Sequence, residues 1–196
     1  MKPGDDQKYL ALQHDSHEVK PQFSPEQLRP KIGTLRAHPQ WGPVIASIPD
    51  EQLMALIGYT AADYRMLNEA LRGERDAAFF AKIRPYVALT QDALARLPNY
   101  VGMCWRGCDL TPQQRAKYNV GKQVEEPSFF SASYDEKRAF RKNTKYTIES
   151  KRSKIVDFLS EHAPEKECLF MAGSHFIVLS VEEQAGGNCH IRMREV

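Results

Sequence analysis

The chain has 196 residues, of which 42% are hydrophobic, and its formal net charge is +2. This length fits one domain with a core of ordinary size, and the apolar fraction excludes a disordered chain. The nearly balanced charge gives no compositional reason to expect a nucleic-acid partner, and no apolar run approaches the ~20 residues of a membrane span.

The first 43 residues are polar and interrupted by proline, which predicts an arm or a linker with a short helix beginning near Ser24. Residues 44–196 are expected to form a single folded domain. The first residues lack the apolar core of a secretory signal, although specialised secretion machines do not need one.

Helical spacing dominates the next part of the chain. Thr60 and Asp63 resemble a capping box, Gly73 is an expected helix end, and Pro85 is expected to divide the last helical stretch in two. The predicted helices are Glu51–Ile57, a segment from Thr60 to Gly73, Ala77–Ile83 and Tyr86–Leu97.

After Pro98 the periodicity changes to that of strands, with only short helices near Gln113–Tyr118 and Asp135–Phe140. The predicted strands are Tyr100–Arg106, Ser128–Ser133, Thr144–Glu149, Lys154–Phe158, Glu167–Met171, His175–Val181 and Cys189–Met193. Helices followed by mainly antiparallel strands indicate an α+β fold.

Four cysteines occur, and none has the paired Cys-x-x-Cys spacing of a metal site. We therefore expect reduced, structural thiols and no bound metal.

Two carboxylates, Glu165 and Glu167, stand one residue apart immediately before an apolar run. In an extended backbone they would project side by side while Lys166 points the other way. Two like charges at such a distance raise at least one of the two pKa values, which suits acid–base chemistry, although an exposed strand end with solvated acids would show the same pattern.

Two further motifs precede this pair. Arg106 and Gly107 end an apolar segment, and Ser131 and Ser133 are spaced to share one face of a strand, with Ala132 facing away. An arginine fork can bind phosphates bidentately, and a serine can hold a carboxylate rotamer. For Ser133, a ligand contact and a cap on the following helix are both open.

Taken in order, the aromatic-Arg-Gly, Phe-Ser-x-Ser and Glu-x-Glu motifs resemble the mono-ADP-ribosyltransferase family of the arginine–serine–glutamate type, in its Glu-x-Glu branch. The resemblance extends from about residue 48 to residue 196. It implies that residues 44–196 are one catalytic domain, with N-terminal helices and a split mixed or antiparallel β-sheet core around a cleft for NAD.

The resemblance also implies roles for individual residues. Glu167 would face the positive charge on the ribose, Ser131 would hold Glu167, and Glu165 would orient an acceptor arginine. Arg106, Gly107 and Ser133 would contribute to the binding of NAD. His162 lies in a loop that in the family touches the protein target.

The implied activity is transfer of ADP-ribose from NAD to an arginine of a target protein by a secreted bacterial toxin or effector acting in the cytoplasm of a target cell. Two alternatives stay open: an NAD glycohydrolase and a catalytically inactive binding member. A cognate immunity protein is an expected partner, no membrane partner is expected, and an RNA acceptor is a less favoured alternative.

Overall fold

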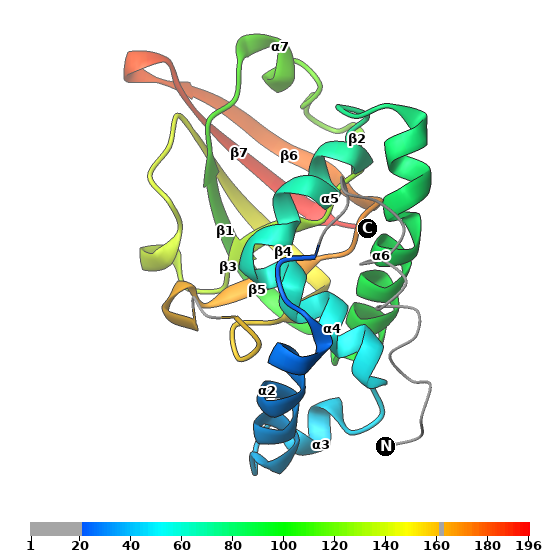
Figure 1. The fold of residues 1–196 in the computed structure, drawn as a ribbon. Helices are drawn as coiled ribbons and strands as arrows, with labels where there is room; N and C mark the ends of the chain where they lie inside the picture. Colours follow the sequence, from blue (N-terminus) through cyan, green and yellow to red (C-terminus); the bar gives the residue numbers. More distant parts are fainter. Residues whose placement is uncertain (1–20, 161–162) are drawn as a thin grey trace. The chain divides into compact units, whose positions relative to one another are not determined.

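The structure is a computed structural model that describes residues 21–160 and 163–196 (Figure 1). The chain divides into two compact units. The first contains the described residues up to Pro98 and a short stretch that begins at Phe158. The second runs from Asn99 to Asp157 and continues after that stretch to Val196. The proposed boundary at residue 43 stays a prediction.

The first unit is helical. The elements formed by its described residues are α2 (Pro25–Ala37), α3 (Gly42–Ile45), α4 (Asp50–Gly58), a π-helical turn (Tyr59–Asp63), α5 (Tyr64–Leu71) and α6 (Ala77–Arg96). Helix α2 begins after Ser24 as predicted, with the Ser24 amide donating to Gln27 Oε1 at 2.8 Å. Helix α4 is buried from Gln52 to Gly58 and therefore occupies the centre of this unit.

Two helical predictions were wrong. Thr60 does not cap a helix, because its hydroxyl donates to the Ile57 carbonyl and the chain continues through the π-helical turn. Pro85 does not divide α6, since the proline lies on the exposed side of a continuous helix, where water can satisfy the carbonyl that it leaves unpaired. Gly73 does end its helix, with φ of 74°.

The described residues of the second unit form seven strands and four short helical segments. The strands are β1 (Tyr100–Cys108), β2 (Gln123–Glu126), β3 (Phe130–Ser133), β4 (Thr144–Ile155), β5 (Glu167–Phe170), β6 (Ser174–Gln184) and β7 (Asn188–Glu195). The helical segments between strands are α7 (Pro112–Arg115) and three 3₁₀ turns, at Glu136–Arg138, Ala163–Glu165 and Ala185–Gly187.

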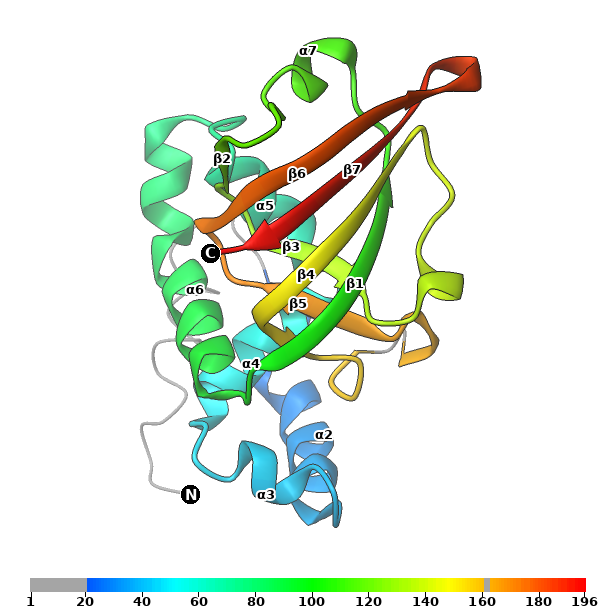
Figure 2. The ribbon, with the colours of Figure 1, turned by 180° about the vertical axis from the view of Figure 1, so that it is seen from behind.

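The sheet is mixed, and β3 and β5 form a small separate part of it. The long strands β1, β4, β7 and β6 lie side by side in that order (Figure 2), with β2 on β6, and only the β4–β7 pair is parallel. Strand β3 pairs with β5 on one side and, through Ser133 and Trp105, with β1 on the other. Strand β5 also pairs with the last residues of β4. This arrangement confirms the α+β class and the split mixed sheet.

Strand β4 corrects another prediction, because it is one strand where the sequence predicted two. The charged residues Lys151 and Arg152 interrupt the hydrophobic pattern. Both of their backbone amides donate to the buried Glu195 carboxylate at 2.7 Å, and this keeps the segment inside the strand. Strand β2 was not predicted, since Val124 is its only apolar residue.

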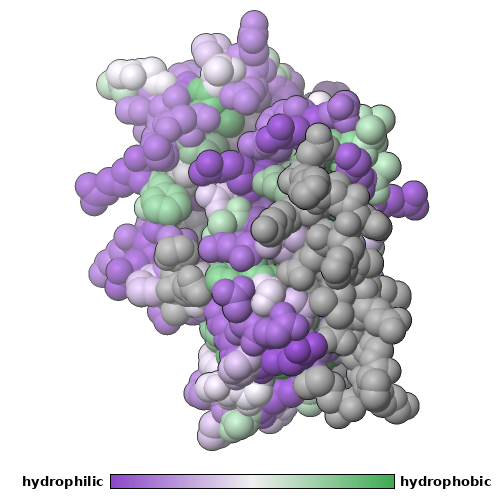
Figure 3. Space-filling model, in the orientation of Figure 1, coloured by the Kyte–Doolittle hydropathy of each residue, from purple (hydrophilic) through white to green (hydrophobic). Residues whose placement is uncertain are grey.

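Apolar side chains fill the interior of the second unit, including Cys104, Ala132 and Cys168. Where described residues are visible in Figure 3, the surface is mainly hydrophilic and the hydrophobic residues lie in small separate areas. All four cysteines are free in this structure. Among the described residues, no helix has the length and hydropathy that a membrane crossing requires.

Candidate active site

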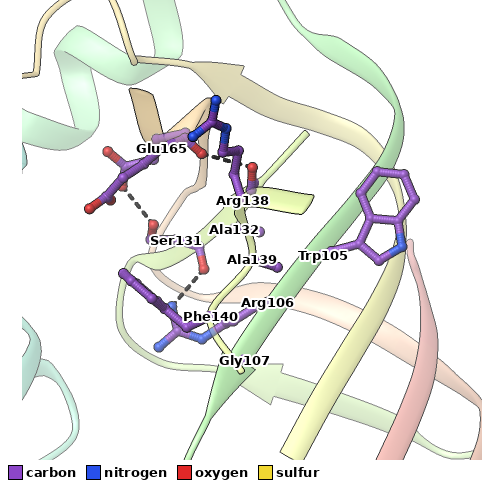
Figure 4. A pocket seen from close by; sticks show the side chains of 11 residues that line it. Trp105, Arg106, Gly107, Ser131, Ala132, Arg138, Ala139, Phe140 and Glu165 are labelled. Atoms are coloured by element: carbon purple, nitrogen blue, oxygen red, sulfur yellow. Dashed lines mark hydrogen bonds between the residues drawn. The ribbon is translucent and has the colours of Figure 1, made fainter. Parts of the chain in front are cut away.

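One pocket of the second unit collects nearly all the residues that the sequence motifs singled out (Figure 4). Strand β1 contributes Arg106 and Gly107, β3 contributes its two serines, and the acidic motif contributes both glutamates. The predicted residues that line the pocket are Arg106, Gly107, Ser131, Ser133, Glu165 and Glu167. His162 lies outside the described residues.

Ser131 and Glu167 form the most direct contact in the pocket. The Ser131 hydroxyl donates to Glu167 Oε1 at 2.6 Å, which fixes the carboxylate on the pocket side of β5. Burial and, to a smaller extent, the charge of Glu165 together raise the pKa of Glu167 to about 7 against the opposing effect of this hydrogen bond. Glu167 therefore titrates near neutral pH.

Arg106 is hydrogen-bonded to the backbone of the same residue, Ser131. Its Nη1 donates to the Ser131 carbonyl oxygen at 2.6 Å, and the guanidinium carbon lies 4.8 Å from the centre of the Phe130 ring. Among the described residues, its buried Nε–H has no acceptor. An arginine with an unused buried donor at a pocket is suited to receive an anionic group.

The two acids reach the pocket by a route that the sequence did not predict. Glu165 ends a 3₁₀ turn that starts at Ala163, and Lys166 adopts a left-handed conformation with φ of 52° before Glu167 begins β5. The expected extended backbone from Glu165 to Glu167 was therefore wrong. Both acids line one pocket because a left-handed residue reverses the chain between them.

Lys166 does point away from the acids, as expected. Its Nζ lies 3.6 Å from Asp157 Oδ2 and 6.0 Å from the centre of the Tyr134 ring. The Tyr134 hydroxyl donates to the same Asp157 oxygen at 2.6 Å. These contacts anchor the left-handed residue through two partners that do not line the pocket.

Ser133 clamps the backbone of this acidic turn. Its hydroxyl donates to the carbonyl oxygens of Glu165 at 2.8 Å and Lys166 at 3.2 Å, and it accepts from the Asp135 amide at 3.1 Å. The following turn at Glu136–Arg138 is capped by Asp135, whose carboxylate accepts from the Lys137 amide, and Ser133 only accepts from the amide of that capping residue. The hydroxyl is already engaged with three backbone groups.

Gly107 has a specific neighbour within the chain. A Cβ atom at this position would overlap the Phe140 carbonyl oxygen, so the absence of a side chain lets the loop after Glu136–Arg138 pack on β1. The turn adds Arg138 to the pocket lining, and the loop adds Phe140. The sequence indicated Arg138 only as one member of a basic cluster between residues 137 and 154, which could form a positive rim for an anionic partner or a solvated face, and no spacing marked it as a pocket residue.

The described residues contain no group of three or more histidines, cysteines or acids that could hold a metal ion. The pocket offers instead a cationic fork, a carboxylate that titrates near neutrality, and a second carboxylate at the same opening. Such a set can bind an anionic substrate, stabilise a positive charge that develops on it, and accept a proton from a second reactant.

No family model matches the sequence. A curated protein of Pseudomonas putida, NAD(+)--protein-arginine ADP-ribosyltransferase Tre1, is 35% identical over 136 residues, which cover 68% of this chain and 27% of that protein. The chain spans between 17% and 33% of the length of three such curated relatives.

Two solved structures are similar over the whole chain. The ADP-ribosyltransferase HopU1 of Pseudomonas syringae superposes with a TM-score of 0.81 at 19% identity and covers 100% of this chain and 98% of its own. The type III effector XopAI of Xanthomonas axonopodis gives 0.77 at 21% identity, covering 100% of this chain and 89% of its own.

The fold of this protein is thus that of an ADP-ribosyltransferase. Together with the curated relatives and the order of the three motifs, it identifies the family: the chain belongs to the bacterial mono-ADP-ribosyltransferases of the arginine–serine–glutamate type.

Proposed function

We propose that this chain is an NAD-dependent mono-ADP-ribosyltransferase that moves ADP-ribose to an arginine of a target protein and releases nicotinamide. One observation carries the proposal: Ser131 binds Glu167 through its hydroxyl and Arg106 through its carbonyl, both at 2.6 Å. A single residue of β3 thereby holds an acid and an anion-binding cation at one pocket.

Glu167 is the group that we assign to cleavage of NAD. When the bond between nicotinamide and ribose breaks, its electron pair leaves with nicotinamide and positive charge develops on the ribose. A fixed carboxylate stabilises that charge. The pKa of about 7 means that burial disfavours the ionised form before substrate binds. A cation beside Glu167 would relieve this cost, so the carboxylate is better matched to the charged transition state than to the empty pocket.

Arg106 is the residue that we assign to the phosphates or the adjoining ribose of NAD. Its buried Nε–H without an acceptor among the described residues supports this role, because a ligand oxygen would satisfy it. Gly107 belongs to the same region through its packing with the Phe140 loop. Ser133 supports the site by holding the acidic turn.

Glu165 is the residue that we assign to the acceptor. A guanidinium is nearly always protonated, and a carboxylate can orient it and take its proton as its nitrogen attacks the ribose. Glu165 is exposed at the pocket whereas Glu167 is half-buried, so an incoming side chain can reach Glu165 first. We also propose, from the family alone, that His162 contacts the target.

The biological setting follows from the family and is likewise a proposal. We propose a secreted effector or toxin that modifies a target protein with an exposed arginine in the cytoplasm of another cell, and that meets a cognate immunity protein in the cell that makes it. XopAI, which shares the fold, is a type III effector.

The test is a paired measurement on Glu165→Gln with labelled NAD and a cell lysate. The amide keeps the size of the side chain but cannot take the guanidinium proton. Labelled protein should therefore fall at least tenfold while free nicotinamide from hydrolysis stays within about threefold. Glu167→Gln should lose both products, and Glu182→Gln, a change at an exposed strand residue, should lose neither.

Each alternative has its own signature in this assay. Free ADP-ribose without labelled protein from the unmodified enzyme would indicate an NAD glycohydrolase. Neither product would indicate a binding protein. Loss of both activities in Glu165→Gln would place Glu165 in NAD cleavage and overturn our division of roles.

A further inference from the structure

Two buried cysteines meet behind the pocket, inside a closed ring of strands. The ring forms because β1 pairs with β3 and β4, and β5 pairs with the same two strands. Cys104 belongs to β1 and Cys168 to β5, so they come from strands that are not hydrogen-bonded neighbours. Both side chains are fully buried in the core of the second unit.

The two sulfur atoms are 2.9 Å apart. A disulfide bond is about 2.05 Å long, so the atoms need to approach by less than about 1 Å to be bonded. The nearest hydroxyl to Cys104 Sγ, that of Ser153, lies farther away at 3.9 Å. The other two cysteines, Cys108 and Cys189, have no such sulfur contact among the described residues.

We propose that Cys104 and Cys168 form a disulfide bond when the chain folds in the presence of a low-molecular-weight disulfide. Two S–H bonds break and one S–S bond forms. The two electrons and two protons pass to glutathione disulfide or a similar compound, which leaves as two thiols. The protein thus has a reduced and an oxidised form with the same fold.

Burial determines when this bond can form. A disulfide in solution reacts with a thiolate, and neither sulfur is accessible once the ring has closed. The hydrogen bond shared with Cys104 also raises the pKa of Cys168 well above the ordinary thiol value. The redox state is therefore fixed while the chain folds and is afterwards protected from thiol reductants by the same burial.

The bond would connect two parts of the site. Cys104 lies two residues before Arg106, and Cys168 directly follows Glu167, so the link would join the strand of the cation to the strand of the acid. It would also close a loop of more than 60 residues, which removes much of the freedom of the unfolded chain.

The experiment starts from chain unfolded in guanidinium under reductant. One half is refolded with reduced glutathione and the other half with glutathione disulfide, and both are then quenched in acid and treated with N-ethylmaleimide in guanidinium at neutral pH. Mass spectrometry should find four maleimides on the reduced sample and two on the oxidised sample. Digestion should yield one linked peptide pair, containing Cys104 and Cys168.

A Cys108→Ala, Cys189→Ala double variant is the matched control, since it retains only the proposed pair. It should take up two maleimides after reducing refolding and none after oxidising refolding. In thermal denaturation the oxidised form of either protein should melt higher than the reduced form by roughly 5–15 °C.

Three results would overturn the proposal. The first is full maleimide uptake after oxidising refolding, and the second is a link or a glutathione adduct that involves Cys108 or Cys189 in place of the proposed pair. The third is a cross-linked protein that melts below the reduced one, since this would show that the bond distorts the ring of strands.

Discussion

Replacing Glu167 with glutamine should abolish the activity and at the same time stabilise the fold. Burial raises the pKa of Glu167 from an ordinary 4.5 to about 7, so the folded protein binds this proton more tightly than the unfolded chain does. The amide keeps the hydrogen bond from Ser131, because its oxygen can accept in the same position. The charge, and with it the cost of burying the charge, is removed.

The sign and the pH range follow from these two values. Below pH 4.5 the carboxyl is protonated in both states and costs nothing. Between pH 4.5 and pH 7 the unfolded chain releases this proton while the folded protein retains it, so the wild-type chain loses stability relative to Glu167→Gln, and the loss is complete above pH 7. The difference between the two pKa values corresponds to about 3 kcal/mol. Because the side chain is only half-buried, we expect about 1–2 kcal/mol after solvent screening.

Thermal denaturation at pH 5 and pH 8 measures this effect. At pH 8 Glu167→Gln should melt roughly 3–8 °C above the wild-type protein, and at pH 5 the two should agree within about 2 °C. Glu182→Gln, at an exposed position, should melt with the wild-type protein at both values. A variant that is less stable at pH 8, or equally stabilised at both pH values, would refute a buried carboxylate with a raised pKa.

Three further predictions concern catalysis and binding. Nicotinamide release at low NAD concentration should increase as the pH rises through about 7 and Glu167 ionises. In Glu165→Gln this pH profile should move to lower pH, because the charge of Glu165 raises the pKa of Glu167. An unmoved profile would contradict the electrostatic coupling between the two glutamates. Arg106→Lys should weaken NAD binding at least tenfold in calorimetric titration, since the contacts of the fork with Ser131 and the ligand are lost; unchanged affinity would place Arg106 outside the site. Gly107→Ala should lower the affinity for NAD with little loss of melting temperature, because the new methyl group displaces the exposed loop at Phe140 and leaves the core in place. An unchanged dissociation constant would show that this loop does not bind NAD.

The sequence predicted the composition of the pocket better than its backbone. Arginine, serine and glutamate can be recognised from their neighbours and their order along the chain, and the structure brings all three to one pocket. The left-handed Lys166 gave no such signal, because lysine has no preference for positive φ and is held there by contacts with Asp157 and Tyr134.

The limits of the secondary-structure prediction have the same origin. Pro85 and the charged pair Lys151 and Arg152 usually end an element, and here long-range contacts or an exposed position allow the element to continue. For Lys151 and Arg152 the deciding group, the Glu195 carboxylate, lies far away in the sequence. Local patterns therefore predicted the number of elements less well than their type.

The way in which β3 and β5 join the sheet has a consequence for the motions of the protein. These two strands share four residue pairs with each other but are connected to β1 by one pair and to β4 by two. In native-state amide exchange, β3 and β5 should therefore open together as one cooperative segment, at a lower free energy than the β1–β4–β7 ladder. Because Glu167 and Ser131 belong to this segment and Arg106 does not, each such opening would separate the acid from the cation and leave the protein inactive until the segment closes again.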